Sequence, residues 1–270
     1  KLKAYASFSA SETLATRLRP TSSLPKALTL QTQTREARYL LNFSETVSFA
    51  GVADLAPLVG MARNAIVLEA PDLIAIRNTL ISARDAKRII INRADELPHL
   101  AGIAEGLTDG AGLIDLINRT ITERGEVLDS ASPALGQIRG RIKVVHARLI
   151  DRLSRYINDA NTMKLLQEPL ITQRGGRYVL PLRAECKGSF KSIIHDQSAS
   201  GATLFVEPVA VVELNNEYRE LELAERDEVL RVLRALTLRI AELHDSLLAS
   251  TRAMAELDLI LMKAKYAEEL

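Results

Sequence analysis

Residues 132–168 read SPALGQIRGRIKVVHARLIDRLSRYINDANTMKLLQE, and this stretch decides the fold. Ser132 followed by Pro133 is a strong helix start, because the hydroxyl caps free N–H groups and proline suits the first helical position. No proline then occurs until Pro169, and apolar residues recur at intervals of three or four. We therefore predict one long outgoing helix over residues 133–168. At about 35 residues it would be ~50 Å long, which is longer than a compact domain normally needs.

A second long helix is predicted over residues 209–248, which contain neither glycine nor proline. Its apolar residues also recur at intervals of three or four, and Glu225 interrupts the stripe. Residues 134–168 hold seven basic and three acidic side chains, whereas residues 209–248 hold five basic and nine acidic ones. Two apolar stripes flanked by opposite charges are what an antiparallel coiled-coil arm needs. We expect the two helices to pair antiparallel.

Between these helices, over residues 169–208, the apolar period changes to two. Gly175-Gly176 and the cluster at residues 198–201 are typical turn signals, and the segments beside them alternate as strands do. Pro181 lies in one of these segments, which predicts that this strand is at an edge of the sheet. We expect a small antiparallel sheet at the tip of the arm.

The remaining segments, residues 1–132 and 249–270, are predicted to form a helical core. Pro25 can open a helix that runs to Leu41, and Pro71-Asp72 opens another, because proline and a carboxylate both suit a first helical turn. The second helix carries one apolar face, made of Leu73, Ile76, Leu80 and Ala83. The predicted fold class is therefore mainly α: a helical core with a long antiparallel two-helix arm, tipped by a small antiparallel sheet.

Composition excludes several classes of protein. The chain has 270 residues, 47% of them apolar and 26% charged, so it is neither disordered nor collagen-like. Cys186 is the one cysteine, which excludes a disulfide framework and indicates a reducing, cytoplasmic compartment. No stretch is long and apolar enough for a membrane span or a signal peptide, and the chain begins at Lys1 without methionine. We expect a piece of a soluble protein without a membrane partner.

A search for catalytic motifs finds almost nothing. No G-x-x-x-x-G-K-[ST] loop is present, and the four histidines stand singly without cysteine pairs, so we expect no metal site and no catalytic residue. His195 and Asp196 are adjacent, so on a strand they face opposite sides and cannot act as a pair. We interpret both as solvated loop groups and Cys186 as a bystander thiol. A stand-alone enzyme has almost no support, and no cofactor is expected in this chain.

The predicted sheet carries most of the chemistry that stands out. Its cations, which we propose as nucleic-acid-binding residues, are Arg174, Arg177, Arg183, Lys187 and Lys191. Residues 171–206 contain these five cations and only two acidic residues, so the segment has a net charge of +3. Such a patch can neutralise phosphates without reading bases, and Tyr178 and Phe190 could stack on bases. The alternative is that these cations only protect exposed strand edges from aggregation.

Four motifs resemble a known family. They are GEVLDSASP at residues 125–133, QRGGRYVLP at residues 173–181, HDQSASGATLFVEP at residues 195–208 and VELNNE at residues 212–217. They closely resemble the entry into the lever, the clamp and the returning lever of the MutS-two subfamily. These bacterial MutS-like proteins lack the mismatch-reading and connector domains of MutS.

The resemblance implies a fold and a function for the parent protein. The implied fold is a helical core, an outgoing lever, a clamp sheet, a returning lever and a core return. Full-length members are implied to be dimeric ATPases that bind branched DNA and suppress recombination; many carry an Smr endonuclease domain, and some act on collided ribosomes. ATP and Mg²⁺ are thus implied for the parent, but this sequence contains no nucleotide-binding loop or nuclease domain to hold them.

We interpret the chain as the core, lever and clamp region of such a protein. Its expected partner is double-stranded or branched DNA, held by phosphate contacts from the tip, and a homodimer is expected for the full-length protein. The alternative is an interaction arm that engages the ribosome and its RNA, or a partner protein. The net charge of +1 does not exclude a nucleic-acid partner, because the two arm helices cancel one another and leave the basic tip.

Overall fold

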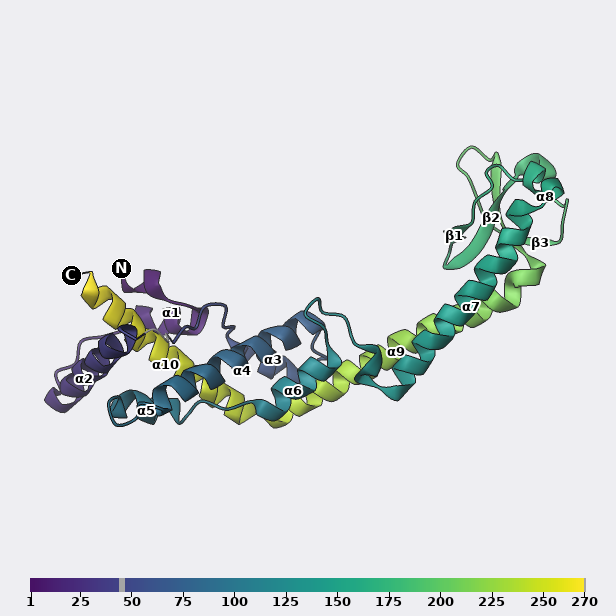
Figure 1. Ribbon diagram of the computed structural model, residues 1–270. Coiled ribbons are helices and arrows are strands. Elements are labelled where there is room, and N and C mark those ends of the chain that lie inside the picture. The colour runs from purple at the N-terminus through teal and green to yellow at the C-terminus, as the bar shows by residue number, and fades with distance from the viewer. Residues whose placement is uncertain (44–46, 270) are drawn as a thin grey trace. The chain divides into compact units, whose positions relative to one another are not determined.

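The computed structural model describes residues 1–43 and 47–269 and divides into two compact units. Unit 1 comprises Lys1–Leu128 and Arg231–Leu270, and unit 2 comprises Asp129–Leu230. Figure 1 shows that unit 1 is helical, whereas unit 2 combines helices with a small sheet. The described residues are mainly α-helical, as predicted from the sequence, and they form one four-stranded antiparallel sheet.

Unit 1 is a helical core, as predicted. Its elements are η1 (Leu2–Tyr5), α1 (Ser9–Thr16), α2 (Leu24–Leu41), α3 (Leu55–Arg63), α4 (Ala70–Ile91), α5 (Pro98–Ala104), α6 (Ala111–Thr120), α10 (His244–Glu268) and the last part of α9 (Val212–Glu242). The predicted apolar face of α4 is fully buried, since Leu73, Ile76 and Leu80 are each 0% exposed. Asp72 accepts a hydrogen bond from the Glu69 N–H at the start of this helix, as its position in the first turn predicts.

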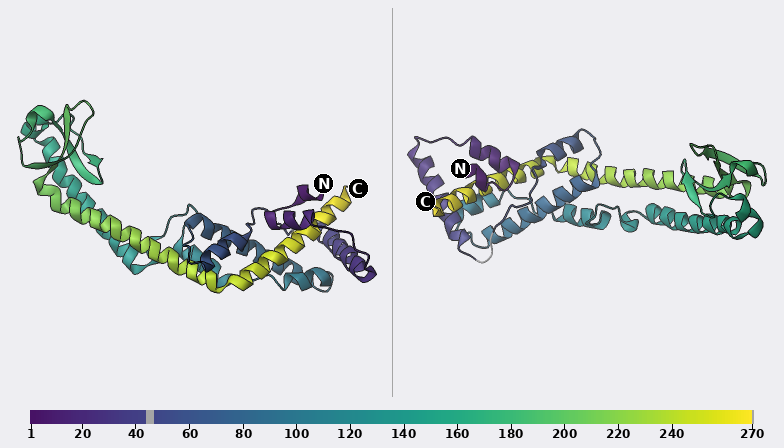
Figure 2. Two further views of the ribbon diagram at one scale, coloured as in Figure 1. Left: turned by 180° about the vertical axis from the view of Figure 1, so that it is seen from behind. Right: turned by 90° about the horizontal axis from the view of Figure 1, so that it is seen from above.

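Helix α10 forms the centre of one of the two apolar clusters of unit 1. It contacts α1, α2, α3 and α5, and Figure 2 shows it in two further views. Residues 257–262 are buried without interruption, so this helix is covered on nearly every side. Asp258, in the middle of that run, accepts hydrogen bonds from the N–H and the hydroxyl of Ser7, at 2.9 and 2.8 Å. This contact satisfies the buried carboxylate and fixes the N-terminal segment to α10.

The prediction of one returning helix over residues 209–248 is wrong, because the structure divides this segment. The segment begins with a 3₁₀ turn, η4 (Val209–Val211), continues as α9, and stops at Glu242 before α10 begins at His244. Leu243 donates its N–H to the Ile240 carbonyl at 3.1 Å, so α9 ends in a tightened turn. No glycine or proline marks this break, and so the sequence pattern did not reveal it.

The predicted outgoing helix over residues 133–168 is also divided. It consists of α7 (Pro133–Asn158) and α8 (Ala160–Leu165), with Asp159 in an extended conformation between them. The Asp159 carboxylate accepts the N–H of Thr162 at 2.8 Å, so it caps α8 and ends α7. The start of α7 is confirmed, because the Ser132 hydroxyl accepts the N–H of Leu135 at 3.0 Å.

Within unit 2, α7 and α9 lie side by side and antiparallel (Figure 2). Arg139 forms an ion pair with Glu225 at 2.6 Å, and Arg141 forms one with Glu217 at 2.9 Å. The residue numbers of the partners decrease along α9 as they increase along α7, as antiparallel helices require. Arg139 also pairs with Asp129 at 2.6 Å, and its guanidinium lowers the pKa of that carboxyl. Glu225, which interrupts the apolar stripe of α9, therefore forms an ion pair with a cation of the opposite helix.

The sheet of unit 2 has the strand order β1-β2-β4-β3, and all its pairs are antiparallel. Its strands are β1 (Thr172–Arg174), β2 (Arg177–Arg183), β3 (Ser192–Gln197) and β4 (Thr203–Pro208), and the 3₁₀ turn η3 (Ala184–Cys186) follows β2. Gly175 and Gly176 join β1 to β2 with φ of 57° and 76°, a tight turn that favours glycine at both positions.

The prediction that Pro181 lies on an edge strand is wrong, because β2 is an inner strand of the sheet. The local geometry explains how the sheet accommodates a proline there. Strand β2 lies between β1 and β4, yet β1 pairs only with residues 177–179. The Pro181 carbonyl accepts the N–H of Gln167 at 2.7 Å, so its backbone polar groups point away from β4. The missing N–H of proline therefore costs no hydrogen bond to β4.

Candidate nucleic-acid interface

The sheet of unit 2 is fixed to the helices by an apolar cluster. The buried members of this cluster are Leu149, Leu153, Leu166, Leu180, Leu182, Leu204, Val206 and Val211. Register pairs Leu180 with Val206 and Leu182 with Leu204, so these four side chains share one face of the sheet. That face packs on α7 and on the start of α9, which holds the strands and their connecting loops in place.

A buried carboxylate, that of Glu207 on β4, organises the polar side of the sheet. It is 0% exposed and accepts hydrogen bonds from Arg177 at 2.8 Å and from Asn215 at 2.6 Å. His195 Nε2 lies 2.6 Å from the same carboxylate, and Arg177 also donates to Asn216 at 2.5 Å. The group ties β2, β3 and α9 together, because each supplies a partner for one buried charge.

Two of the predicted cations are committed to internal contacts. Arg177 is 28% exposed and pairs with buried Glu207. Arg183 donates from Nε to the Leu166 carbonyl at 3.1 Å and lies 3.9 Å from Glu185. Arg177 therefore neutralises a buried charge in this structure, while Arg183 divides its guanidinium between a backbone oxygen and an exposed acid.

Arg174 is partly committed. Its guanidinium carbon lies 4.0 Å from the centre of the Phe205 ring, and its Nε lies 3.5 Å from the Asp196 carboxylate. The contact with the ring face is a cation–π interaction. The Nη1 group donates to the Gln173 carbonyl at 2.9 Å, and the side chain as a whole is 41% exposed.

Lys187 and Lys191 are the predicted cations that keep their charge available. Both are exposed, and neither side chain forms an ion pair or a hydrogen bond with a described residue. They belong to residues 184–191, the connection from β2 to β3, which we call the lysine loop. Gly188 lies between them with φ of 86°, so the loop turns sharply with no side chain at that position.

The structure does not bring the five predicted cations to one place. Arg174 and Arg177 lie opposite one another in the register of β1 and β2, on either side of the turn. The Lys191 carbonyl accepts the N–H of Val209, just past the end of β4. Register therefore places these three cations at the end of the sheet where β4 leads into α9. Arg183 lies opposite Thr203 in the register of β2 and β4, at the other end of the sheet. Lys187 comes one turn after Arg183 in the chain.

The aromatic side chains of the sheet pack internally. Tyr178 contacts the rings of His146 and Tyr218, with centroids 5.2 and 5.5 Å apart, and Phe190 contacts Tyr156 at 5.7 Å. Burial, together with a hydrogen bond to Tyr178, raises the pKa of Tyr218. The expectation that Tyr178 and Phe190 stack on bases is therefore not favoured, because both rings already pack against helices.

The sequence pattern does not reveal the organising roles of Glu207, Asn215 and Asn216, and His195 has a different role from the one predicted. The interpretation of His195 as a solvated loop group is wrong, because it lies on β3 with its side chain 23% exposed and bound to Glu207. The prediction that it does not pair with Asp196 is confirmed, since Asp196 pairs with Arg174 instead. The one usable signal was a lone carboxylate at the end of the apolar strand LFVEP.

Within residues 1–43 and 47–269, no group of three His, Cys, Asp or Glu side chains is arranged to hold a metal ion. None of the helices in these ranges is long and apolar enough to cross a membrane.

Comparison with known proteins identifies relatives of this chain. No family model matches it. A protein named endonuclease MutS2 from Thermomicrobium roseum is 40% identical over 274 residues, which covers 100% of this chain and 34% of that protein. Proteins of the same name from Geobacillus sp. and Pelotomaculum thermopropionicum are 38% and 37% identical over 94% of this chain. The chain is homologous to endonuclease MutS2.

This homology agrees with the resemblance read from the sequence motifs. It covers almost the whole chain, so units 1 and 2 both lie within the matched region. The chain spans about a third of the length of these MutS2 relatives. It therefore corresponds to one region of MutS2, made of a helical unit and a unit that carries a sheet.

Proposed function

We propose that unit 2 binds nucleic acid through the lysine loop, by contacts with the phosphate backbone of double-stranded or branched DNA. The observation that carries the proposal is the pair Lys187 and Lys191, exposed and without side-chain partners among the described residues. Exposed cations of this kind bind phosphates by releasing condensed counterions, and they select shape rather than base sequence. The absence of a side chain at Gly188 allows a phosphate to approach the backbone closely.

The other three cations then have supporting roles. Arg177 holds Glu207, and Arg183 holds the Leu166 carbonyl, so both maintain the sheet rather than contact DNA. Arg174 is partly exposed and would add a phosphate contact once it leaves Asp196. The relatives are named endonucleases, which makes nucleic acid the partner class that this homology supports. In a longer MutS2 protein, unit 2 would hold DNA for an ATP-dependent dimer that suppresses recombination.

The double substitution Lys187→Ala with Lys191→Ala tests the proposal. We expect branched-DNA affinity to fall about tenfold at ~0.1 M salt, because two phosphate contacts are lost. The slope of log K against log salt concentration should become shallower by about 1.8, since each lost contact contributes about 0.9. Both quantities are measured by fluorescence anisotropy with a labelled four-way junction, in a titration repeated at several salt concentrations.

A matched control uses two exposed lysines of unit 1, Lys26 and Lys265. The double variant Lys26→Ala with Lys265→Ala removes the same charge and should leave affinity and slope near those of the unchanged chain. If both double variants weaken binding equally, net charge explains the effect. If neither changes the salt slope, the lysine loop does not contact phosphate.

A second candidate function is contact with a partner protein or the ribosome. It is favoured by β3, an edge strand on which Ile193 and Ile194 are 44% and 41% exposed. Exposed apolar side chains on a free strand edge are typical of protein contact surfaces. Ile193→Thr with Ile194→Thr should then abolish co-sedimentation with ribosomes. Binding to ribosomes without binding to branched DNA would favour this function over the first.

A further inference from the structure

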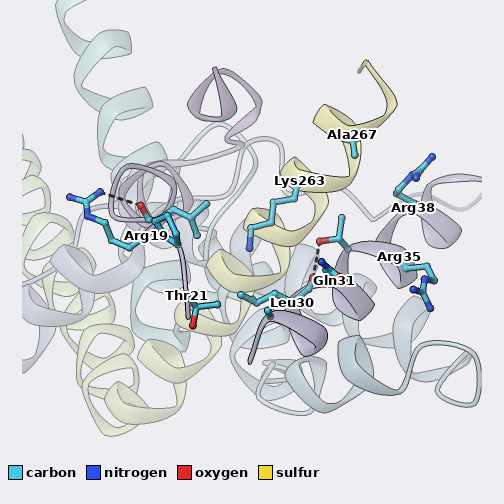
Figure 3. Close-up of a pocket in the computed structure, with 12 residues that line it drawn as sticks. Arg19, Thr21, Leu30, Gln31, Arg35, Arg38, Lys263 and Ala267 are labelled. Carbon is cyan, nitrogen blue, oxygen red and sulfur yellow. Dashed lines mark hydrogen bonds between the residues drawn. The ribbon is translucent and has the colours of Figure 1, made fainter. Parts of the chain in front are cut away.

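A cavity in unit 1 has no role in the proposed function of unit 2. It is a surface pocket that is open to solvent, has a volume of about 670 Å³ and lies between α2, α10 and the segment that precedes α2. Figure 3 shows Lys263 extending from α10 into this space, above Leu30 of α2. The volume is within the range of cavities that hold small organic ligands.

The charged residues that line the cavity are all of one sign. They are Arg19, Arg35, Arg38 and Lys263, and no Asp or Glu is among the described residues that line it. None of the four forms an ion pair with a described residue, although Arg19 donates to the neighbouring Leu18 carbonyl at 3.1 Å. Four cations with no acidic residue beside them in the lining create a positive potential that favours a ligand with at least two negative charges.

Lys263 is the cation most affected by its surroundings. It is partly buried, and this loss of solvation lowers the pKa of its ammonium group, while Glu256 raises it by a smaller amount. A partly buried ammonium group that lacks a hydrogen-bonding partner is costly for the protein. A bound anion would supply that partner and restore the pKa, so ligand binding and protonation of Lys263 would favour one another.

The rest of the lining is mainly apolar. Leu18, Pro20, Ala27, Leu30 and Ala267 form the walls, and Thr21 adds a hydroxyl group at one side. Arg35 and Arg38 are exposed on α2 at the outer rim, and Figure 3 shows their guanidinium groups pointing away from Lys263, so either one must turn to contact a ligand in the pocket. The cavity thus offers apolar walls for an organic body and cations for a multiply charged group, which matches a phosphate ester better than a singly charged carboxylate.

We propose that this cavity binds a small organic phosphate, a phosphate monoester with an apolar or aromatic body of about nucleotide size. The phosphate would pair with Lys263 and with an arginine of the rim, and the body would lie against Leu30 and Pro20. Two sources share this chemistry: a free nucleotide and the 5′-phosphorylated end of a nucleic-acid strand. The site is in unit 1 and does not depend on the lysine loop.

The experiment uses AMP as the probe with the whole 270-residue chain, measured by isothermal titration calorimetry. We expect AMP to bind with a dissociation constant below ~1 mM, and adenosine or inorganic phosphate alone to bind at least about tenfold more weakly. Lys263→Met should weaken AMP binding at least about tenfold, because it keeps the stem and removes the charge. Ala267→Phe, which fills the cavity, should have a similar effect without a change in charge.

Lys26→Met is the matched control, since Lys26 is an exposed lysine of α2 that does not line the cavity. Circular dichroism of each variant shows whether it folds. A 5′-phosphorylated trinucleotide that binds more tightly than AMP identifies a strand end as the source, and weaker binding identifies a free nucleotide. No binding of AMP at millimolar concentration, or equal binding by the Lys263→Met and Lys26→Met variants, would overturn the proposal.

Discussion

Replacement of Glu207 by alanine should lower the free energy of unfolding of unit 2 by about 3 kcal/mol. The carboxylate is 0% exposed and accepts from Arg177 and Asn215, and it lies beside His195 Nε2. Its removal takes the buried charged acceptor from Arg177 and Asn215, which keep their hydrogen bonds to Asn216 and to the Tyr178 carbonyl. Breaking a buried pair in this way usually costs about 3–5 kcal/mol. The lower end of that range applies because Arg177 is 28% exposed and regains some hydration.

Hydrogen exchange of the amides in β2 and β4, followed by mass spectrometry, measures this loss within unit 2. Peptides from α4 in unit 1 serve as an internal reference and should be unchanged. Glu185→Ala is the matched control, because that carboxylate is 76% exposed and lies 3.9 Å from Arg183. Such an exposed pair contributes about 0–1 kcal/mol. A loss below about 1 kcal/mol for Glu207→Ala would contradict the organising role of this carboxylate.

Leu153→Ala should destabilise unit 2 by about 2–5 kcal/mol. Leu153 is 0% exposed on α7 and belongs to the apolar cluster that includes Leu180 and Val206 of the sheet. The substitution removes buried apolar surface and leaves a cavity between the helix and the strands. The same hydrogen-exchange peptides report the effect, and the amides of β2 should exchange faster by about one and a half to three and a half orders of magnitude, at about 1.4 kcal/mol for each factor of ten.

The control for this substitution is Met163→Ala, which removes an apolar side chain from α8 that is 46% exposed. We expect a change of no more than about 0.5 kcal/mol, as for other surface substitutions. If the two variants are equally stable, then the sheet is not held to α7 by this cluster. The lysine loop would in that case lack the support that the proposed function assigns to it.

The sequence predicted the fold wherever a local pattern determines it. The apolar face of α4, the capped start of α7 at Ser132 and the glycine turn before Arg177 each depend on neighbours a few residues away. The break at Asp159 was also readable, because an aspartate before Ala-Asn-Thr is an N-cap signal that was not applied within a long helix. The break at Leu243 had no such signal, because neither glycine nor proline lies near it.

The candidate site was less predictable, because charge alone does not show which cations are already paired. Arg177 finds its acceptors on Glu207 and Asn216, which lie 30 and 39 residues away in sequence. Only the packed sheet and α9 bring these groups together. Lys187 and Lys191 differ from Arg177 in the structure, but all five cations look alike in a sequence pattern.

Site-specific photo-crosslinking tests the central claim most directly, namely that the lysine loop contacts nucleic acid. In a Cys186→Ser background, Ser189→Cys places a label within the loop, and Asp115→Cys places the same label on an exposed position of α6 in unit 1. Under conditions where a branched DNA is bound, we predict crosslinks from position 189 that high salt abolishes. Bound DNA that crosslinks no more from position 189 than from position 115 would contradict the account.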